Sequence, residues 1–137
     1  MSILSVGNRE RKNGFLGIGL GTLSTEYYSR IGTQKDTVGY WDDGSIFHGS
    51  WDQISYTDGH TYIPEYTFQD GDVVGLELNT IELNGLTLRY CRFRKNGKSV
   101  GPSMLMDTTL DLFPYICFHN SGSHVKPSVT VKGISSI

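Results

Sequence analysis

Alanine is absent from this sequence, and cysteine and proline are scarce. Alanine is the best helix former, whereas Val, Ile and Thr together number thirty, so the composition favours strands over helices. The only two cysteines, Cys91 and Cys117, each lie in an apolar run typical of a strand, and we expect two buried thiols. No run of 18 apolar residues could cross a bilayer as a helix.

An excess of charge of either sign is also missing. Twelve Lys and Arg against fourteen Asp and Glu leave a net charge of -2, which gives no basic field for nucleic acid. A secretory signal would need an apolar run over residues 15–23, which Gly17, Gly19 and Gly21 interrupt. We therefore expect a cytoplasmic or nuclear protein with neither nucleic acid nor membrane as its partner.

Turn-forming residues divide the chain into short segments. Seventeen glycines and four prolines are spread along 137 residues, about one domain's length, and predict an all-β, antiparallel two-sheet β-sandwich. Residues 1–13 are interpreted as a lead-in or edge strand and residues 14–137 as the sandwich domain. We expect strands over residues 15–20, 37–41, 45–48, 72–78, 115–118 and 125–131. Long irregular stretches cover residues 21–36 and 49–67.

Two Asn-Gly pairs, at residues 84–85 and 96–97, give the strongest hairpin signal. Between them, side chains alternate so that each face of the strand carries a bulky apolar group, which is typical of a strand inside a sandwich. One face holds Leu86, Leu88 and Tyr90, and the other holds Thr87, Arg89, Cys91 and Phe93. A further turn is expected at residues 42–44, and Trp41 before it is expected in the core.

Motifs for catalysis or metal binding are weak or missing. His48, His60, His119 and His124 do not have the spacing of a zinc site, and no pair among the fourteen acids stands out as a catalytic pair. A Gly-x-Ser-x-Gly elbow is lacking, and no helix follows the glycines at residues 14–19. We expect no cofactor, no metal, no catalytic residue and no enzymatic activity.

Five short motifs in a fixed order resemble the SPRY domain, and within it the Ran-binding-protein-M-like type. They span most of the chain, so the resemblance implies a concanavalin-like jelly roll for the whole sandwich. The motifs are GIGL at residues 17–20, VGYWDDGSIFHG at 38–49, DGDVVG at 70–75, FRKNGKSVG at 93–101 and DLFP at 111–114.

The resemblance implies a non-enzymatic protein-protein interaction module that binds a short linear peptide or a partner protein through loops at one end of the sandwich. It is also compatible with a scaffold or adaptor role in a multi-subunit assembly such as a ubiquitin-ligase complex. Carried over by position, the partner-binding residues are Thr22, Tyr27, Tyr28 and Arg30 from the first long loop and His119, Asn120 and Ser121 from the loop after the DLFP motif.

Two other functions remain open from the residues alone. A lectin-like sandwich could stack sugars on Trp51 and Tyr56 beside Asp58. A structural domain could instead associate with its own copies through an uncovered N-terminal edge. Tyr27, Tyr28 and Trp51 suit a core position and an exposed position equally well.

Overall fold

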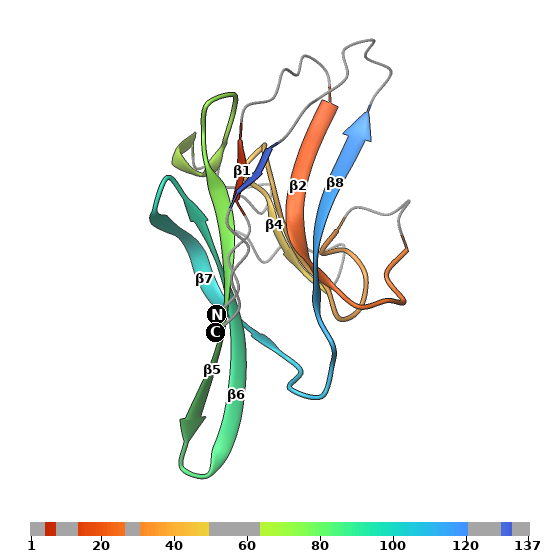
Figure 1. Ribbon diagram of the computed structural model, residues 1–137, viewed down its shortest axis with the longest axis vertical. Coiled ribbons are helices and arrows are strands. Elements are labelled where there is room, and N and C mark those ends of the chain that lie inside the picture. Colours follow the sequence, from red (N-terminus) through yellow and green to blue (C-terminus); the bar gives the residue numbers. More distant parts are fainter. Residues whose placement is uncertain (1–4, 8–13, 27–30, 50–63, 121–129, 133–137) are drawn as a thin grey trace.

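Two antiparallel sheets form the molecule (Figure 1), and the predicted two-sheet β-sandwich is confirmed. The computed structural model describes residues 5–7, 14–26, 31–49, 64–120 and 130–132. The first sheet has the order β7 (Lys98–Met106), β6 (Leu86–Lys95), β5 (Val74–Leu83), β1 (Ser5–Gly7) and β9 (Thr130–Lys132). The second has the order β4 (Ile46–His48), β3 (Val38–Trp41), β2 (Gly14–Gly21) and β8 (Phe113–Asn120).

A short 3-10 helix, η1 (Pro64–Tyr66), is the single helical element of these described ranges. No helix in the described part of the chain has the length and apolar character needed to span a membrane.

The main core lies between the two sheets. Alternation along β2 turns Leu16, Ile18 and Leu20 inward, where each is at most 2% exposed. At the centre, the Tyr40 ring lies 4.9 Å from the ring of Phe68 in an edge-on contact. Its hydroxyl donates a hydrogen bond to the backbone carbonyl of Tyr66, and burial raises the pKa of Tyr40. The other buried side chains of this core are Val38, Ile46, Val74, Leu76, Cys91, Phe93, Val100, Met104 and Met106.

A second, smaller core covers the outer face of the four-stranded sheet. Ile31, Trp41 and Phe47 pack there, and the Trp41 indole N–H donates to the Ile31 carbonyl at 3.0 Å. A Cβ on Gly19 would lie 2.0 Å from the Val38 carbonyl oxygen, and one on Gly17 would lie 2.6 Å from the Trp41 ring. The glycines of the GIGL motif therefore let the segment that begins at residue 31 lie directly on the sheet.

Both Asn-Gly pairs form the predicted hairpin turns. Asn84 and Gly85 have φ values of 51° and 80°, and Asn96 and Gly97 have 49° and 83°, which is the signature of type I′ turns. Trp41, at 1% exposure, is in the core as expected.

Several strand limits differ from the sequence-based expectation. β8 is longer than the predicted residues 115–118 at both ends, because its pairing with β2 continues through the flanking residues. β5 begins two residues later than the predicted residues 72–78 but continues to Leu83, because its pairing with β6 extends to that point. β1 is not an edge strand: it pairs with β5 on one side and with β9 on the other. Cys91 is buried, as expected, but Cys117 is only half-buried, because it belongs to the outer-face cluster beside Trp41. Burial raises the pKa of both thiols.

Candidate functional site

The residues predicted to bind a partner do not form one face. Thr22 directly follows β2, where Gly21 pairs with Phe113 at the start of β8. His119 and Asn120, expected in a loop, continue β8 and pair with the first residues of β2. The reason is that the β2–β8 ladder continues beyond residue 118. Thr22 and Asn120 therefore lie at opposite ends of an eight-residue ladder, a separation of roughly 20 Å.

The remaining predicted residues lie outside the described part of the chain. These are Tyr27, Tyr28, Arg30 and Ser121 from the predicted binding face and Trp51, Tyr56 and Asp58 from the lectin-like alternative. Their proposed roles stay predictions.

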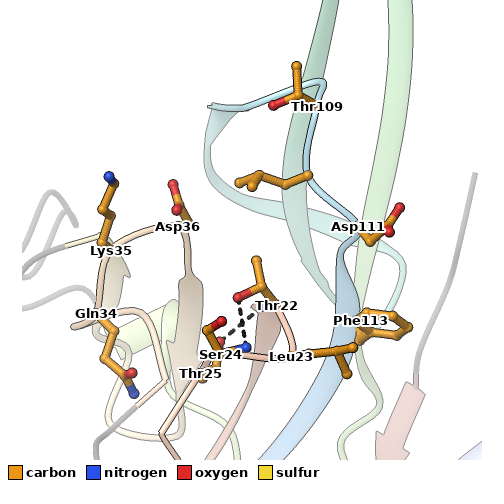
Figure 2. A pocket seen from close by; sticks show the side chains of 11 residues that line it. Thr22, Leu23, Ser24, Thr25, Gln34, Lys35, Asp36, Thr109, Asp111 and Phe113 are labelled. Atoms are coloured by element: carbon orange, nitrogen blue, oxygen red, sulfur yellow. Dashed lines mark hydrogen bonds between the residues drawn. The ribbon is translucent and has the colours of Figure 1, made fainter.

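A cavity of about 520 Å³ opens at the Thr22 end of the four-stranded sheet, which we call the loop pocket (Figure 2). Two segments of the β2–β3 connection and one segment of the distant β7–β8 connection line it, together with the first residue of β8. They are residues 22–25 after β2, residues 34–36 before β3, residues 109–111 before β8, and Phe113.

The first wall of the loop pocket is a tight turn closed by its own hydroxyl groups. The Thr22 N–H donates to the Thr25 hydroxyl oxygen at 2.9 Å, and the Ser24 N–H donates to the Thr22 hydroxyl oxygen at 3.2 Å. The Thr25 N–H closes the turn onto the Thr22 carbonyl at 3.1 Å. From β8, the Tyr115 hydroxyl donates to that same carbonyl at 2.5 Å. The turn is therefore fixed both within itself and to the sheet.

The second wall is braced by one glutamine side chain. Gln34 accepts the Glu26 N–H on its side-chain oxygen and donates its amide to the Glu26 carbonyl, both at 2.8 Å. This pair of bonds ties Glu26, inside the first long loop, to Gln34 near the end of that loop, with a reciprocal pattern like that of paired strands. The buried Thr37 hydroxyl donates to the Gln34 carbonyl at 2.6 Å, and Asp36 takes a left-handed backbone with φ of 64°.

The third wall is held from the neighbouring sheet by an arginine. Arg89 of β6 donates to the Leu110 carbonyl at 2.7 Å. The Asp107 carboxylate accepts the Thr109 N–H at 2.8 Å and its hydroxyl at 2.7 Å, which fixes the start of the connection to β8. Those bonds hold the pKa of Asp107 below its usual range. All three walls are thus ordered by hydrogen bonds independent of any ligand.

The lining of the loop pocket combines exposed apolar surface with acidic groups. Leu23 is 84% exposed and Phe113 40% exposed, although both are large apolar side chains. In Figure 2, Asp36 and Asp111 stand on either side of the turn, and Lys35 is the one cation among the lining residues that the structure describes. Such a surface suits a ligand that offers an apolar side chain next to a positively charged group.

Sequence reasoning placed Thr22 at a binding loop but missed the second and third walls of the loop pocket. The signal for them was weak: two polar stretches, TQKD at residues 33–36 and DTTLD at 107–111, each directly before a strand. Neither stretch contains a pattern that predicts its contact with the other. Within the residues that the structure describes, no three His, Cys, Asp or Glu side chains come together as metal ligands would.

Comparison with known proteins relates this chain to Ran-binding proteins. It is 31% identical over 115 residues to a Ran-binding proteins 9/10 homolog of Drosophila melanogaster and 32% identical to Ran-binding protein 9 of Xenopus tropicalis. Human Ran-binding protein 9 is 31% identical over the same length. Each match covers 83% of this chain, but the chain spans only 10% to 18% of these relatives' length. No protein-family model matches the chain.

The fold itself is found in a solved structure. A human SPRY domain superposes on 95% of this chain with a TM-score of 0.69, at 20% sequence identity, and 74% of that domain is covered. The resemblance carried by the five motifs is thereby confirmed, and the jelly-roll architecture that it implied is the one observed.

Proposed function

We propose that this chain, which has the fold of a SPRY domain, is a protein-interaction module that binds a short peptide segment of a partner protein in the loop pocket. Its relatives are named for binding Ran, and their interaction role motivates the proposal. The observation that carries it is the loop pocket itself: apolar side chains are left exposed on walls that hydrogen bonds already hold in place.

Preorganisation is the physical reason to expect useful affinity. Ordering a loop on binding costs roughly 0.5–1.5 kcal/mol for each side chain that loses its freedom. In the loop pocket the Gln34 brace, the Tyr115 hydroxyl and the Arg89 bond to Leu110 supply that order in advance. Contacts with a peptide are therefore not offset by a large cost of closing the loops.

The lining also sets the expected chemistry of the peptide. Leu23 and Phe113 offer an apolar anchor point, because their uncovered surface gains free energy when it leaves water. Asp36 and Asp111 favour a Lys or Arg beside that anchor. We expect a motif with an aliphatic or aromatic residue adjacent to a basic one.

The direct test is selection from a random phage-displayed peptide library on the purified chain, followed by titration of the enriched peptides against variants. Phe113→Ser and Asp111→Lys should each weaken binding about tenfold or more, the effect of losing a binding hot spot. Glu65→Lys is the matched charge control: Glu65 is exposed on η1, and its carbonyl contacts Lys95, about 20 Å along β6 from Arg89.

Glu65→Lys should leave the affinity within twofold of the wild-type value. Peptides that bind all three variants equally well would contradict the proposal, as would enrichment of acidic sequences. All variants are first checked for unchanged melting temperature, so that a loss of affinity is not a loss of fold.

A further inference from the structure

We infer that the β5–β6 hairpin carries a second binding surface, separate from the loop pocket, that takes an amphipathic, acidic helix of a partner protein. Figure 1 shows this hairpin extending past the rest of the described strands. β5 and β6 pair from Val74–Lys95 through to Leu83–Leu86, whereas β7 joins β6 only from Arg89 onward. The end of the hairpin beyond Arg89 is therefore a two-stranded ribbon without β7 beside it.

The two faces of this ribbon have the opposite character to that of a normal sandwich strand. Residues paired across an antiparallel ladder share a face, so the register assigns each side chain. The face that continues the core carries Thr80, Glu82, Thr87 and Arg89, all polar. The outer face, which should be polar, carries an apolar patch bordered by Asn79, the partner of Tyr90. The patch is made of Ile81, Leu83, Leu86, Leu88, Tyr90 and Leu105.

Much of the patch is uncovered. Leu83, Leu86 and Leu105 are 55%, 65% and 60% exposed, and Ile81 is 43% exposed. Together such side chains leave on the order of a few hundred Å² of contiguous apolar surface, the size of the patches that mark binding sites on soluble proteins. This area is small against the roughly 800 Å² per partner of a standard dimer interface, so a short segment fits the patch better than a second copy does.

The shape of the patch favours a helix. It spans two to three strands, a width of roughly 10 Å, which equals the diameter of an α-helix with its side chains. Along the strands it continues for about 13 Å, from Leu83 to the level of Tyr90, which is the length of two to three helical turns. An amphipathic helix lying along the ribbon would cover the patch with one face.

Positive charge at one end of the patch is the reason to expect acidic side chains on the partner's helix. Arg92 and Arg94 follow Tyr90 on the outer face, and within the described strands Glu77 is the one acid that the register places with them. Glu77 pairs with Arg94 at 2.5 Å, whereas Arg92 reaches the neutral Ser103 hydroxyl at 2.6 Å. This end of the patch therefore carries an excess positive charge, and carboxylates on the bound helix would complement it.

The test uses a phage-displayed library of amphipathic helices whose apolar stripe and flanking charges are randomised. Selection on the full chain should enrich helices with aliphatic stripes that end in Asp or Glu. Leu86→Lys should weaken their binding about tenfold or more, whereas Thr87→Lys, the adjacent residue on the opposite face, should change it less than twofold. Arg92→Gln should reduce the preference for acidic over neutral flanks.

Three results would overturn the inference: no enriched helix, equal binding to the Leu86→Lys and Thr87→Lys variants, or enrichment of basic flanks. Sedimentation of the free chain adds a fourth. A dimer that Leu86→Lys dissociates would assign the patch to a second copy instead. Phe113→Ser, which tests the loop pocket, should leave helix binding unchanged, so failure of one proposal is distinguishable from failure of the other.

Discussion

Replacement of Gly39 by alanine should be among the most destabilising single changes in this chain. A Cβ at this position would lie 2.0 Å from the Ile31 carbonyl oxygen, whereas contacts of real Cβ atoms are essentially never shorter than 3.0 Å. That oxygen also accepts the Trp41 indole N–H. To make room, the backbone at residue 31 must move away from the sheet, and the bond to Trp41 must lengthen.

The expected magnitude follows from these two effects. Overpacking a close-packed site costs about 1–3 kcal/mol, and weakening a buried hydrogen bond adds about 1 kcal/mol. We therefore expect the free energy of unfolding to fall by about 2–4 kcal/mol and the melting temperature by roughly 10–15 °C. Residues 34–36 follow the displaced segment and line the loop pocket, so peptide binding should weaken at temperatures where the variant is still folded.

Urea unfolding followed by tryptophan fluorescence, with thermal melting by circular dichroism, measures this effect. Gly85→Ala is the control: its φ is 80°, but a Cβ there would meet nothing within 4 Å. It should cost only the strain of the left-handed backbone, about 1 kcal/mol. A Gly39→Ala protein as stable as the Gly85→Ala protein would refute the close approach of residue 31 to the sheet.

Three further predictions concern single contacts. Asp42→Ala removes the buried carboxylate that accepts the Leu16 N–H at 3.0 Å. Because the buried Leu16 N–H then lacks an acceptor, the free energy of unfolding measured in urea should fall by about 1–3 kcal/mol. The hydrogen bond from Arg94 lowers the pKa of Glu77, so its stabilisation is present above the usual pKa of about 4.3 and is lost as the pH falls through the lower folded-state value. The stability difference between the wild type and Glu77→Gln should then shrink from pH 7 to pH 3, and a constant difference would contradict this assignment. Tyr115→Phe deletes the hydroxyl donor that fixes the first wall of the loop pocket. It should lower the free energy of unfolding by only about 1 kcal/mol, while titration calorimetry should show a weaker affinity for the library-selected peptides.

Much of the fold could be predicted because its signals are local. An Asn-Gly pair between alternating segments specifies a type I′ hairpin wherever it occurs, and both pairs in this chain form one. The absence of alanine and the abundance of β-branched residues likewise bear on each segment separately. The lengths of β5 and β8 could not be predicted in this way, because a strand continues as long as its partner does.

The candidate site was harder to predict, since it depends on which loops meet. Thr22 was identified, but the strand register separates it from His119 and Asn120 and brings it to residues 34–36 and 109–111 instead. Arg89 illustrates the difficulty. The alternation correctly groups it with Cys91 and Phe93 on one face of its strand, yet its role as a brace depends on a carbonyl 21 residues away. No local pattern encodes such a contact.

Peptide binding in the loop pocket can be observed residue by residue in ¹H–¹⁵N correlation spectra of the labelled chain titrated with a library-selected peptide. If the peptide occupies the loop pocket, the largest shifts fall on residues 22–25, 34–36 and 109–111, with little change at the β6–β7 turn at residues 96–97. Saturable shifts centred elsewhere, with these three segments unmoved, would contradict binding in the loop pocket.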